Sequence, residues 1–359
     1  MWVPEFSRPQ EVHITPIMNI RRERVLSRPG EVLVDLGAFV EPDTVVARAE
    51  KPGPIHVLSL CAALGVPPDK VKRLLTKGLG DNLEIGTTIA VRRQWLGLRR
   101  RRAPSPVAGK FAGFDDTGYA LIRGQPEPVE ITAFVRGRVA NVMPRFGVVV
   151  ELTGALIQGV WGSGSEAAGV LRTKIDDPSQ PLEAAAIDVA SRGAIMVGGS
   201  ATEATLRAAA EHQVSGLVLA SLDAGLRAMV SNLPFPVALL EGFGSIPINR
   251  PAFELLAELD GHDASISGRT VPRWGRTRPE VIISRHRAQP PAVEAGGAWQ
   301  KGDRVHITAS PHTGQVGEIV ALVRQGKTVD SGDRLPGCQV RLDSKEIVFV
   351  PWTNLERLR

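Results

Sequence analysis

Several features are scarce in this sequence, and each scarcity excludes a class of protein. There are only two cysteines, Cys61 and Cys338, which are too few and too isolated for a disulfide framework or a zinc site. No apolar run approaches the roughly 18 residues that a transmembrane helix requires. The first residues also lack the basic segment and apolar run of a secretory signal. We therefore expect a soluble, cytoplasmic protein with no metal site and no membrane contact.

Glycine and proline, by contrast, are abundant, with 37 and 27 residues. This abundance favours many turns and short strands over long helices. The chain has 359 residues and an apolar content of 43%, which is enough for two to four domains with separate cores. The composition therefore predicts a β-rich, multidomain protein.

The net charge of +5 is unevenly distributed. Residues 1–182 carry 24 Lys and Arg against 19 Asp and Glu, whereas residues 183–268 carry 4 against 10. Residues 269–298 are basic, with 6 against 2, and residues 299–359 are near balance, with 9 against 7. A protein that binds nucleic acid usually concentrates its positive charge on one face. The basic candidates are therefore the N-terminal half and the segment 269–298.

The N-terminal half is predicted to contain a leading arm and a β domain. Residues 1–29 have no clear period and are assigned to an arm with at most one strand. Residues 30–175 contain short apolar runs broken by glycine, which is typical of hairpin strands. Residues 56–77 interrupt these runs, because apolar residues recur there at helical spacing. We expect a β domain with a helical insertion.

Two hairpins of this domain have similar sequences. Residues 109–114 and 137–142 share a glycine, a basic residue, an apolar residue and an alanine in the same order. Each is followed by a turn and another apolar strand, so the two hairpins are expected to pack together. The pattern resembles the barrel-sandwich hybrid fold of biotinyl and lipoyl carriers and adaptor proteins. The carriers' Met-Lys pair is missing at both Lys110 and Met143, so we expect no cofactor.

Residues 184–268 alternate between strand and helix. Apolar runs predict strands at 194–197, 217–220 and 237–240, and helical spacing predicts helices at 206–212, 224–230 and 252–259. Ser200 followed by Glu203 is a capping box that predicts the start of the first helix. This alternation implies a small parallel α/β layer with right-handed crossovers.

The turns after these strands offer a candidate ligand site. In open α/β sheets, ligands bind beyond the carboxyl ends of the strands, where helix N-termini attract anions. The polar residues of these turns are Ser200, Ser221, Asp223, Glu241 and Ser245. They could hold a small anion or a nucleotide, but short strand-to-helix turns require the same residue types. No histidine or lysine lies nearby in sequence, so spacing alone assembles no catalytic group, and Glu241 is the carboxylate to test.

Residues 299–359 form a further β-rich segment. Gly302–Ile307 and Pro311–Val320 are typical of two short strands joined by a glycine-containing turn. They resemble a KOW motif, which implies a small SH3-like barrel that contacts RNA or a neighbouring protein in transcription or ribosomal machinery. The core of this barrel is expected to contain Trp299, Phe349 and Trp352. The candidate contact residues are Lys301, Arg304, His312 and Arg324.

Arginine, which can bind phosphate through two parallel hydrogen bonds, is clustered in two segments. The first cluster has six members within eleven residues: Arg92, Arg93, Arg99, Arg100, Arg101 and Arg102. The second lies in the basic linker 269–298 and includes Arg273, Trp274 and Arg276. Each cluster is either a contact surface for RNA or DNA or a solvated loop that faces acidic surface, such as residues 183–268. Trp274 favours a contact surface in the second cluster.

The expected fold is multidomain, β and α/β. It comprises a barrel-sandwich-hybrid-like N-terminal domain, a small parallel α/β layer and a C-terminal SH3-like barrel. The leading functional hypothesis is a non-catalytic binding or scaffolding protein of a transcription- or translation-associated assembly. Such a protein would contact nucleic acid or protein through the arginine clusters and the KOW-like module. The alternative is a small-ligand-binding protein or enzyme that uses residues 184–268. A third hypothesis, an envelope adaptor, is opposed by the missing export signal.

Overall fold

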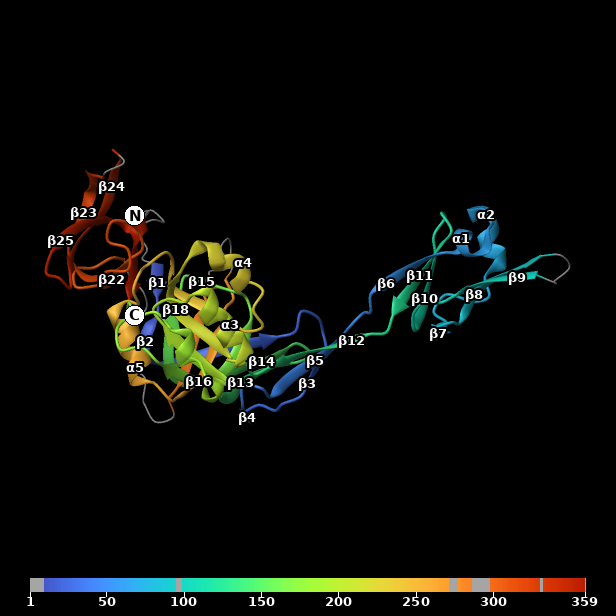
Figure 1. The fold of residues 1–359 in the computed structure, drawn as a ribbon, viewed down its shortest axis with the longest axis horizontal. Helices are drawn as coiled ribbons and strands as arrows, with labels where there is room; N and C mark the ends of the chain where they lie inside the picture. The colour runs from blue at the N-terminus through green and yellow to red at the C-terminus, as the bar shows by residue number, and fades with distance from the viewer. Residues whose placement is uncertain (1–9, 95–98, 271–276, 286–297, 330–331, 359) are drawn as a thin grey trace.

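A computed structural model describes residues 10–94, 99–270, 277–285, 298–329 and 332–358. Strands account for 49% of the chain and helices for 14%, so the prediction of a β-rich protein with several sheets is confirmed. Figure 1 shows a central body with a C-terminal module at one end and a distal module held away from its other end by a two-stranded arm. Within the described ranges, no helix is long and apolar enough to cross a bilayer.

The central body is built on an eleven-stranded sheet. Along the sheet the strands are β15 (Trp161–Gly162), β19 (Val237–Phe243), β18 (Gly216–Leu222), β17 (Ala194–Gly198), β16 (Glu166–Thr173), β20 (Asp263–Ser267), β21 (Glu280–Ser284), β14 (Gly147–Gln158), β13 (Gly137–Met143) and β4 (Phe39–Val40), and β2 (Ile14–Val25) also pairs with β14. Strands β16 to β19 are parallel, whereas β20, β21 and β14 pair antiparallel. One sheet therefore runs from the predicted α/β layer into the predicted N-terminal β domain.

Helices cover both faces of the parallel strands. They are α3 (Glu203–Glu211), η6 (Ala224–Leu226), α4 (Arg227–Val230) and α5 (Arg250–Glu258), preceded by η4 (Ala184–Ala186) and η5 (Val189–Ser191). Ile195 of β17 packs in the same core as Leu256 of α5, whereas Met196 packs with Leu206 of α3, because successive side chains of a strand point to opposite faces. The predicted alternation of strand and helix is thus present in residues 184–268.

The first helix of this layer has a different cap from the predicted one. The N-cap residue is Thr202, whose hydroxyl accepts a hydrogen bond from the backbone N–H of Thr205 at 3.2 Å, and α3 begins at Glu203. Ser200 does not cap the helix. Its carbonyl accepts the N–H of Leu182 at 2.8 Å, which keeps Ser200 bonded to a neighbouring segment and moves the cap to Thr202.

The residues predicted as a leading arm contain two strands. β1 (Gln10–Val12) pairs in parallel with β26 (Leu355–Leu358), and β2 pairs antiparallel with β14 over most of its length. Ile20 of β2 is buried in the central body. The arginines that obscured the strand pattern form ion pairs across the sheet: Arg21 with Glu151, Arg22 with Glu280 and Arg24 with Glu166.

The distal module, residues 55–124, has its own sheet and its own helices. The sheet has the order β6 (Ile55–Ser59), β11 (Tyr119–Gly124), β10 (Gly109–Phe114) and β7 (Asn82–Leu83). The helices are α1 (Leu60–Leu64), α2 (Pro68–Val71) and η2 (Lys72–Leu74), and a hairpin of β8 (Thr88–Gln94) and β9 (Arg99–Pro104) packs beside them. All of these elements contribute to one apolar core, in which Leu60, Ile89 and Ile122 are fully buried.

Two predictions for this region are corrected. Residues 55–59, most of which were predicted as helix, form strand β6, with Val57 exposed and Leu58 packed against the core. The two similar hairpins, β10 with β11 and β13 with β14, do not pack together. The first belongs to the core of the distal module and the second to that of the central body. Each hairpin buries its apolar face within its own module, so neither requires the other.

The arm is a two-stranded ribbon of β5 (Val45–Lys51) and β12 (Glu127–Thr132), with β3 (Glu31–Val32) beside β5 at its base. Between the arm and the distal sheet, the chain passes through residues 52–54 and 124–126, both of which contain proline. Proline has no N–H to donate to a ladder, so the pairing is interrupted there. A Cβ atom on Gly53 would overlap the backbone oxygens of Gly124 and Gln125, so this close crossing requires glycine.

The C-terminal module is a six-stranded sheet curved around a small core. Its order is β1, β26, β22 (Arg304–Ile307), β23 (Val316–Thr328), β24 (Arg334–Leu342) and β25 (Ile347–Pro351), with η7 (Trp352–Asn354) before β26. Trp299 is buried in this core and Trp352 packs against it, whereas Phe349 lines a surface cavity. β22 and β23 occupy the two runs predicted as strands, and the turn between them contains Gly314.

Candidate nucleic-acid interface

The first arginine cluster lies on the hairpin of β8 and β9 in the distal module (Figure 1). Arg92 is directly opposite Arg101, and Arg93 is directly opposite Arg100. Arg99 is opposite Gln94. Like charges in directly opposed positions destabilise a pair of strands. The hairpin therefore carries an electrostatic cost that an anionic partner would remove.

One face of this hairpin is held against the module. Opposed residues share a face and successive residues alternate, so Arg92 and Arg101 lie on the face of the buried Ala103. The guanidinium of Arg92 donates to the backbone oxygens of Leu64, at 3.0 Å, and Gly65. These oxygens belong to the C-terminal end of α1, where a cation is favourable. Arg92 therefore helps to attach the hairpin to the module core.

The opposite face carries three exposed arginines, Arg93, Arg100 and Arg102. Among the residues that the structure describes, none of the three forms an ion pair with a carboxylate. Arg93 is on β8 and Arg100 and Arg102 are on β9, and the two strands lie about 4.8 Å apart. The result is a compact set of guanidinium groups that can donate hydrogen bonds to the phosphate oxygens of a ligand.

The whole distal module is basic. Residues 55–124 carry 12 Lys and Arg against 5 Asp and Glu, a net charge of +7. The remaining residues carry 31 against 33, a net charge of −2. The net charge of residues 1–182 is smaller than that of the distal module alone, because acidic residues of the arm and central body offset its positive charge.

The distal module does not face the acidic segment of its own chain. Figure 1 shows the hairpin at the far end of the molecule from the helices and strands of residues 183–268. The arm between them is a paired ribbon. The hairpin therefore does not face residues 183–268, the acidic surface named in one of the two interpretations of the first cluster.

The second arginine cluster has a different environment. Arg273, Trp274 and Arg276 lie outside the described residues. The described arginines of the linker are paired with carboxylates: Arg269 with Glu166 at 3.3 Å, Arg285 with Glu258 at 2.6 Å, and Arg278 with Glu356. Part of the linker is also core, since Val281, Ile282 and Ile283 of β21 are buried in the central sheet. Its described charges therefore stabilise the fold.

The basic residues predicted in the C-terminal module are exposed but stand among acids. Arg304 lies opposite Glu318 and 3.9 Å from Asp343. Lys301 and Arg324 are exposed to solvent. This mixed pattern does not form the single-sign surface found on the distal module.

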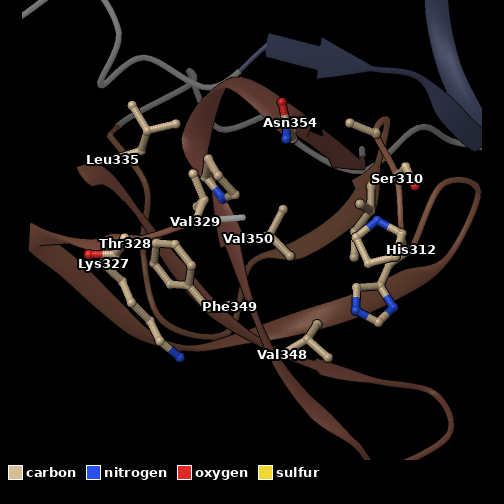
Figure 2. Close-up of a pocket in the computed structure, with 14 residues that line it drawn as sticks. Ser310, His312, Lys327, Thr328, Val329, Leu335, Val348, Phe349, Val350 and Asn354 are labelled. Atoms are coloured by element: carbon tan, nitrogen blue, oxygen red, sulfur yellow. The ribbon is translucent and has the colours of Figure 1, made fainter. Parts of the chain in front are cut away.

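His312 lines a cavity of about 520 Å³ in the C-terminal module. Figure 2 shows Lys327 and Phe349 at one end of this cavity and Ser310 and His312 at the other. The ammonium of Lys327 lies 5.7 Å from the centre of the Phe349 ring, within the range of a cation–π interaction. The predicted contact residue His312 therefore lies in a groove that also presents an aromatic ring and a cation.

Two of the predicted ligand residues of the α/β layer bond to the backbone of the loops at this edge of the sheet. The hydroxyl of Ser221 donates to the oxygen of Ile246 at 2.9 Å, and Asp223 accepts the N–H of Gly225 at 2.7 Å. Ser221 is buried and Ser245 is exposed. The backbone after β17 is also hydrogen-bonded, because the N–H of Gly199 donates to the backbone oxygen of Gln180 at 2.8 Å. These contacts serve the loop structure that short strand-to-helix turns require.

Glu241, the candidate ligand carboxylate named in the sequence analysis, is part of a buried charged network. Its side chain is fully inaccessible and accepts hydrogen bonds from both nitrogens of Asn249, at 3.1 Å from the backbone and 2.7 Å from the side chain. Its other oxygen accepts from Nε2 of His306 at 2.8 Å. His306 comes from β22 and Glu241 from β19, so the pair joins the C-terminal module to the central body.

The network continues on the other side of His306. Its Nδ1 lies 3.9 Å from Glu356, which is paired with Arg278. Burial lowers the pKa of His306, but the hydrogen bond to Glu241 and the nearby charge of Glu356 outweigh burial and raise the pKa to about 9. Burial raises the pKa of Glu356, but the nearby charge of His306 and the ion pair with Arg278 lower it overall. His306 is therefore a cation at neutral pH, and its bonds fix the two bodies together.

Sequence reasoning missed this network because its members are far apart in the chain. Glu241 and His306 are separated by 65 residues, and no local spacing links them. A comparison of the sequence with models of known protein families gives no match, and a comparison with curated proteins gives none either.

Proposed function

We propose that this chain is a non-catalytic binding protein of a gene-expression assembly, and that its distal module contacts the phosphate backbone of RNA or DNA. The observation that carries the proposal is the concentration of charge at the end of the arm. There, a net charge of +7 includes three exposed arginines without carboxylate partners among the described residues. Phosphate contacts of this kind supply most of the affinity of sequence-independent binding.

The gene-expression setting rests on the resemblance of residues 302–320 to a KOW motif. In this proposal the C-terminal module is the scaffold contact, and its groove with His312 and Phe349 is the surface available to RNA or a neighbouring protein. The buried pair of His306 and Glu241 supports a fixed placement of this module, because it joins two bodies through charged hydrogen bonds. The arm would then present the distal module at a set position relative to that scaffold.

The test is binding of a labelled single-stranded RNA and a labelled DNA duplex, measured by fluorescence anisotropy at several salt concentrations. The logarithm of affinity falls with the logarithm of salt by about 0.9 per neutralised phosphate for a duplex and by about 0.7 for a single strand. A variant with Arg93→Gln, Arg100→Gln and Arg102→Gln should lose about three phosphate contacts. Its slope should be shallower by about 2.7 for the duplex or about 2.1 for the single strand.

A matched control changes the same amount of charge elsewhere. Arg21, Arg207 and Arg250 are exposed arginines of the central body, each paired with a glutamate. Their triple glutamine variant should keep the parental slope, because these residues lie on a different body from the hairpin. Equal slopes for the parent and both triple variants would refute the assignment of the hairpin as the phosphate contact. An equal loss of affinity in both triple variants would refute it too, because affinity would then depend only on net charge. A comparison of the affinities for the RNA and for the DNA duplex shows which nucleic acid is preferred.

A further inference from the structure

The outer face of the distal sheet is apolar and exposed. Tyr119 and Leu121 of β11 alternate with the buried Ala120 and Ile122, so they point away from the module core. Val57 of β6 lies directly opposite Leu121 on the same face. Val57 is 59% exposed and Tyr119 is 41% exposed. A row of apolar side chains that solvent can reach on a small module marks a contact surface.

This row ends at two cations and a cavity. Lys110 of β10 is directly opposite Arg123 of β11, and both side chains are exposed. Together with Glu50 and Glu84, they line a cavity of about 600 Å³ at the neck between the sheet and the arm. Arg123 is also opposite Ile55 of β6, which is 52% exposed. The apolar row and the basic end of the cavity are therefore one continuous surface.

The adjacent edge of the sheet is open. β6 is the terminal strand, with β11 on one side and no partner strand on the other among the described residues. Half of the backbone N–H and C=O groups of an edge strand point away from its partner and can pair with another chain. The exposed side chains of β6, Ile55 and Val57, are spaced as an added strand requires, because alternate residues share a face.

We propose that this surface is a docking site for an extended peptide segment of a protein partner, which adds to β6 as a further strand and carries an apolar and an acidic residue two positions apart, on the same face. The apolar side chain would continue the row of Val57 and Leu121, and the carboxylate, beside Ile55, would reach across β6 toward Arg123. The net charge of +7 on the module selects an acidic partner. The aliphatic side chains select protein over nucleic acid, because bases bind by stacking on aromatic rings and this row has one, Tyr119. This mode of recognition draws affinity from main-chain bonds and specificity from alternate side chains.

The test uses the full chain as bait for a display library of random decapeptides. The peptides selected should carry an apolar and an acidic residue two positions apart, so that both side chains lie on the face of Val57 and Arg123. A labelled synthetic peptide of the selected sequence should bind about tenfold more weakly to Val57→Lys and to Arg123→Glu, since each variant removes a contact of about one hydrophobic side chain or one charge pair. Binding to the matched controls Val129→Lys, on the arm, and Arg145→Glu, on the central body, should equal binding to the parent.

Three outcomes would overturn this inference. Selected peptides without this spacing, or peptide binding that is unchanged in Val57→Lys, would refute the peptide site. Loss of RNA binding in Val57→Lys equal to that of the triple glutamine variant would make the face a nucleic-acid surface. Dimers of the chain alone that dissociate in Val57→Lys would make the occupant a second copy. Thermal melting checks that each variant folds, and Tyr119→Ser replaces Val57→Lys if that variant does not.

Discussion

Replacing Glu241 with glutamine should test how the C-terminal module is fixed to the central body. The glutamine side chain keeps one oxygen to accept from Asn249, but it removes the charge that holds the proton on His306. The buried imidazole then faces a neutral amide, and the remaining charges of the network are Glu356 and Arg278. Breaking a buried ion pair by removing one partner typically costs about 3 to 5 kcal/mol.

The pKa of His306 sets the pH range of this effect. The pKa is raised from 6.5 to about 9 in the folded chain, so folding favours the protonated form. The stabilisation is fully present below about pH 6.5 and is lost as the pH rises through about 9. A shift of this size corresponds to about 3 kcal/mol, at about 1.4 kcal/mol per pH unit. Because Glu356 supplies part of this shift, the cost of Glu241→Gln should be at most about 3 kcal/mol at pH 6.5 and much smaller near pH 10.

Urea unfolding followed by tryptophan fluorescence measures this difference, because Trp299 is buried in the C-terminal module that the network anchors. Glu254→Gln is the matched control. Glu254 is 62% exposed and pairs with Arg250 on the surface of α5, so its replacement should change stability by less than about 1 kcal/mol at either pH. The reasoning is refuted if Glu241→Gln costs the same at both pH values, or if its effect at pH 6.5 is no larger than that of the control.

Two other substitutions test the cores. Gly118→Ala should destabilise the distal module by about 1 to 3 kcal/mol, because φ is +85° at this residue and an added Cβ would overlap the sulfur of Cys61. The rate of amide hydrogen exchange in β11 should rise, while the rate in β18 stays unchanged. Ile282→Asp should destabilise the chain by more than about 4 kcal/mol, since it places a carboxylate at a buried position of β21. A thermal melting curve like that of the parent would show that β21, which lies in the segment predicted as a linker, is not part of the core.

The fold was predictable where burial leaves a local pattern. Strands β17, β18 and β19 are covered on both faces, so their sequences are continuous apolar runs, and all three were found. β2 was missed because it is buried at Ile20 while its arginines pair across the sheet with carboxylates more than a hundred residues away. Residues 56–59 were assigned to a helix because apolar residues in a short segment fit both periods. Only pairing with β11 makes them a strand.

The candidate site was predictable only in part. The cluster from Arg92 to Arg102 is visible in the sequence, but its division into two faces follows from the register of β8 and β9. The network of Glu241 and His306 depends on two strands of different sheets meeting at a module boundary, which no spacing reveals. Local patterns identify elements and clusters of charge, whereas contacts between distant segments require the tertiary structure.

The arm gives the charge distribution its physical consequence. β5 has 7 residues, so the ribbon spans about 23 Å at about 3.3 Å per residue. At physiological ionic strength the screening length is about 8 Å, so nearly three screening lengths separate the distal module from the central body. Had the module packed on the acidic layer of residues 183–268, opposite charges would have paired and the hairpin would have been neutralised. Held at the end of the arm, the module acts toward an anionic partner as a separate body of charge +7.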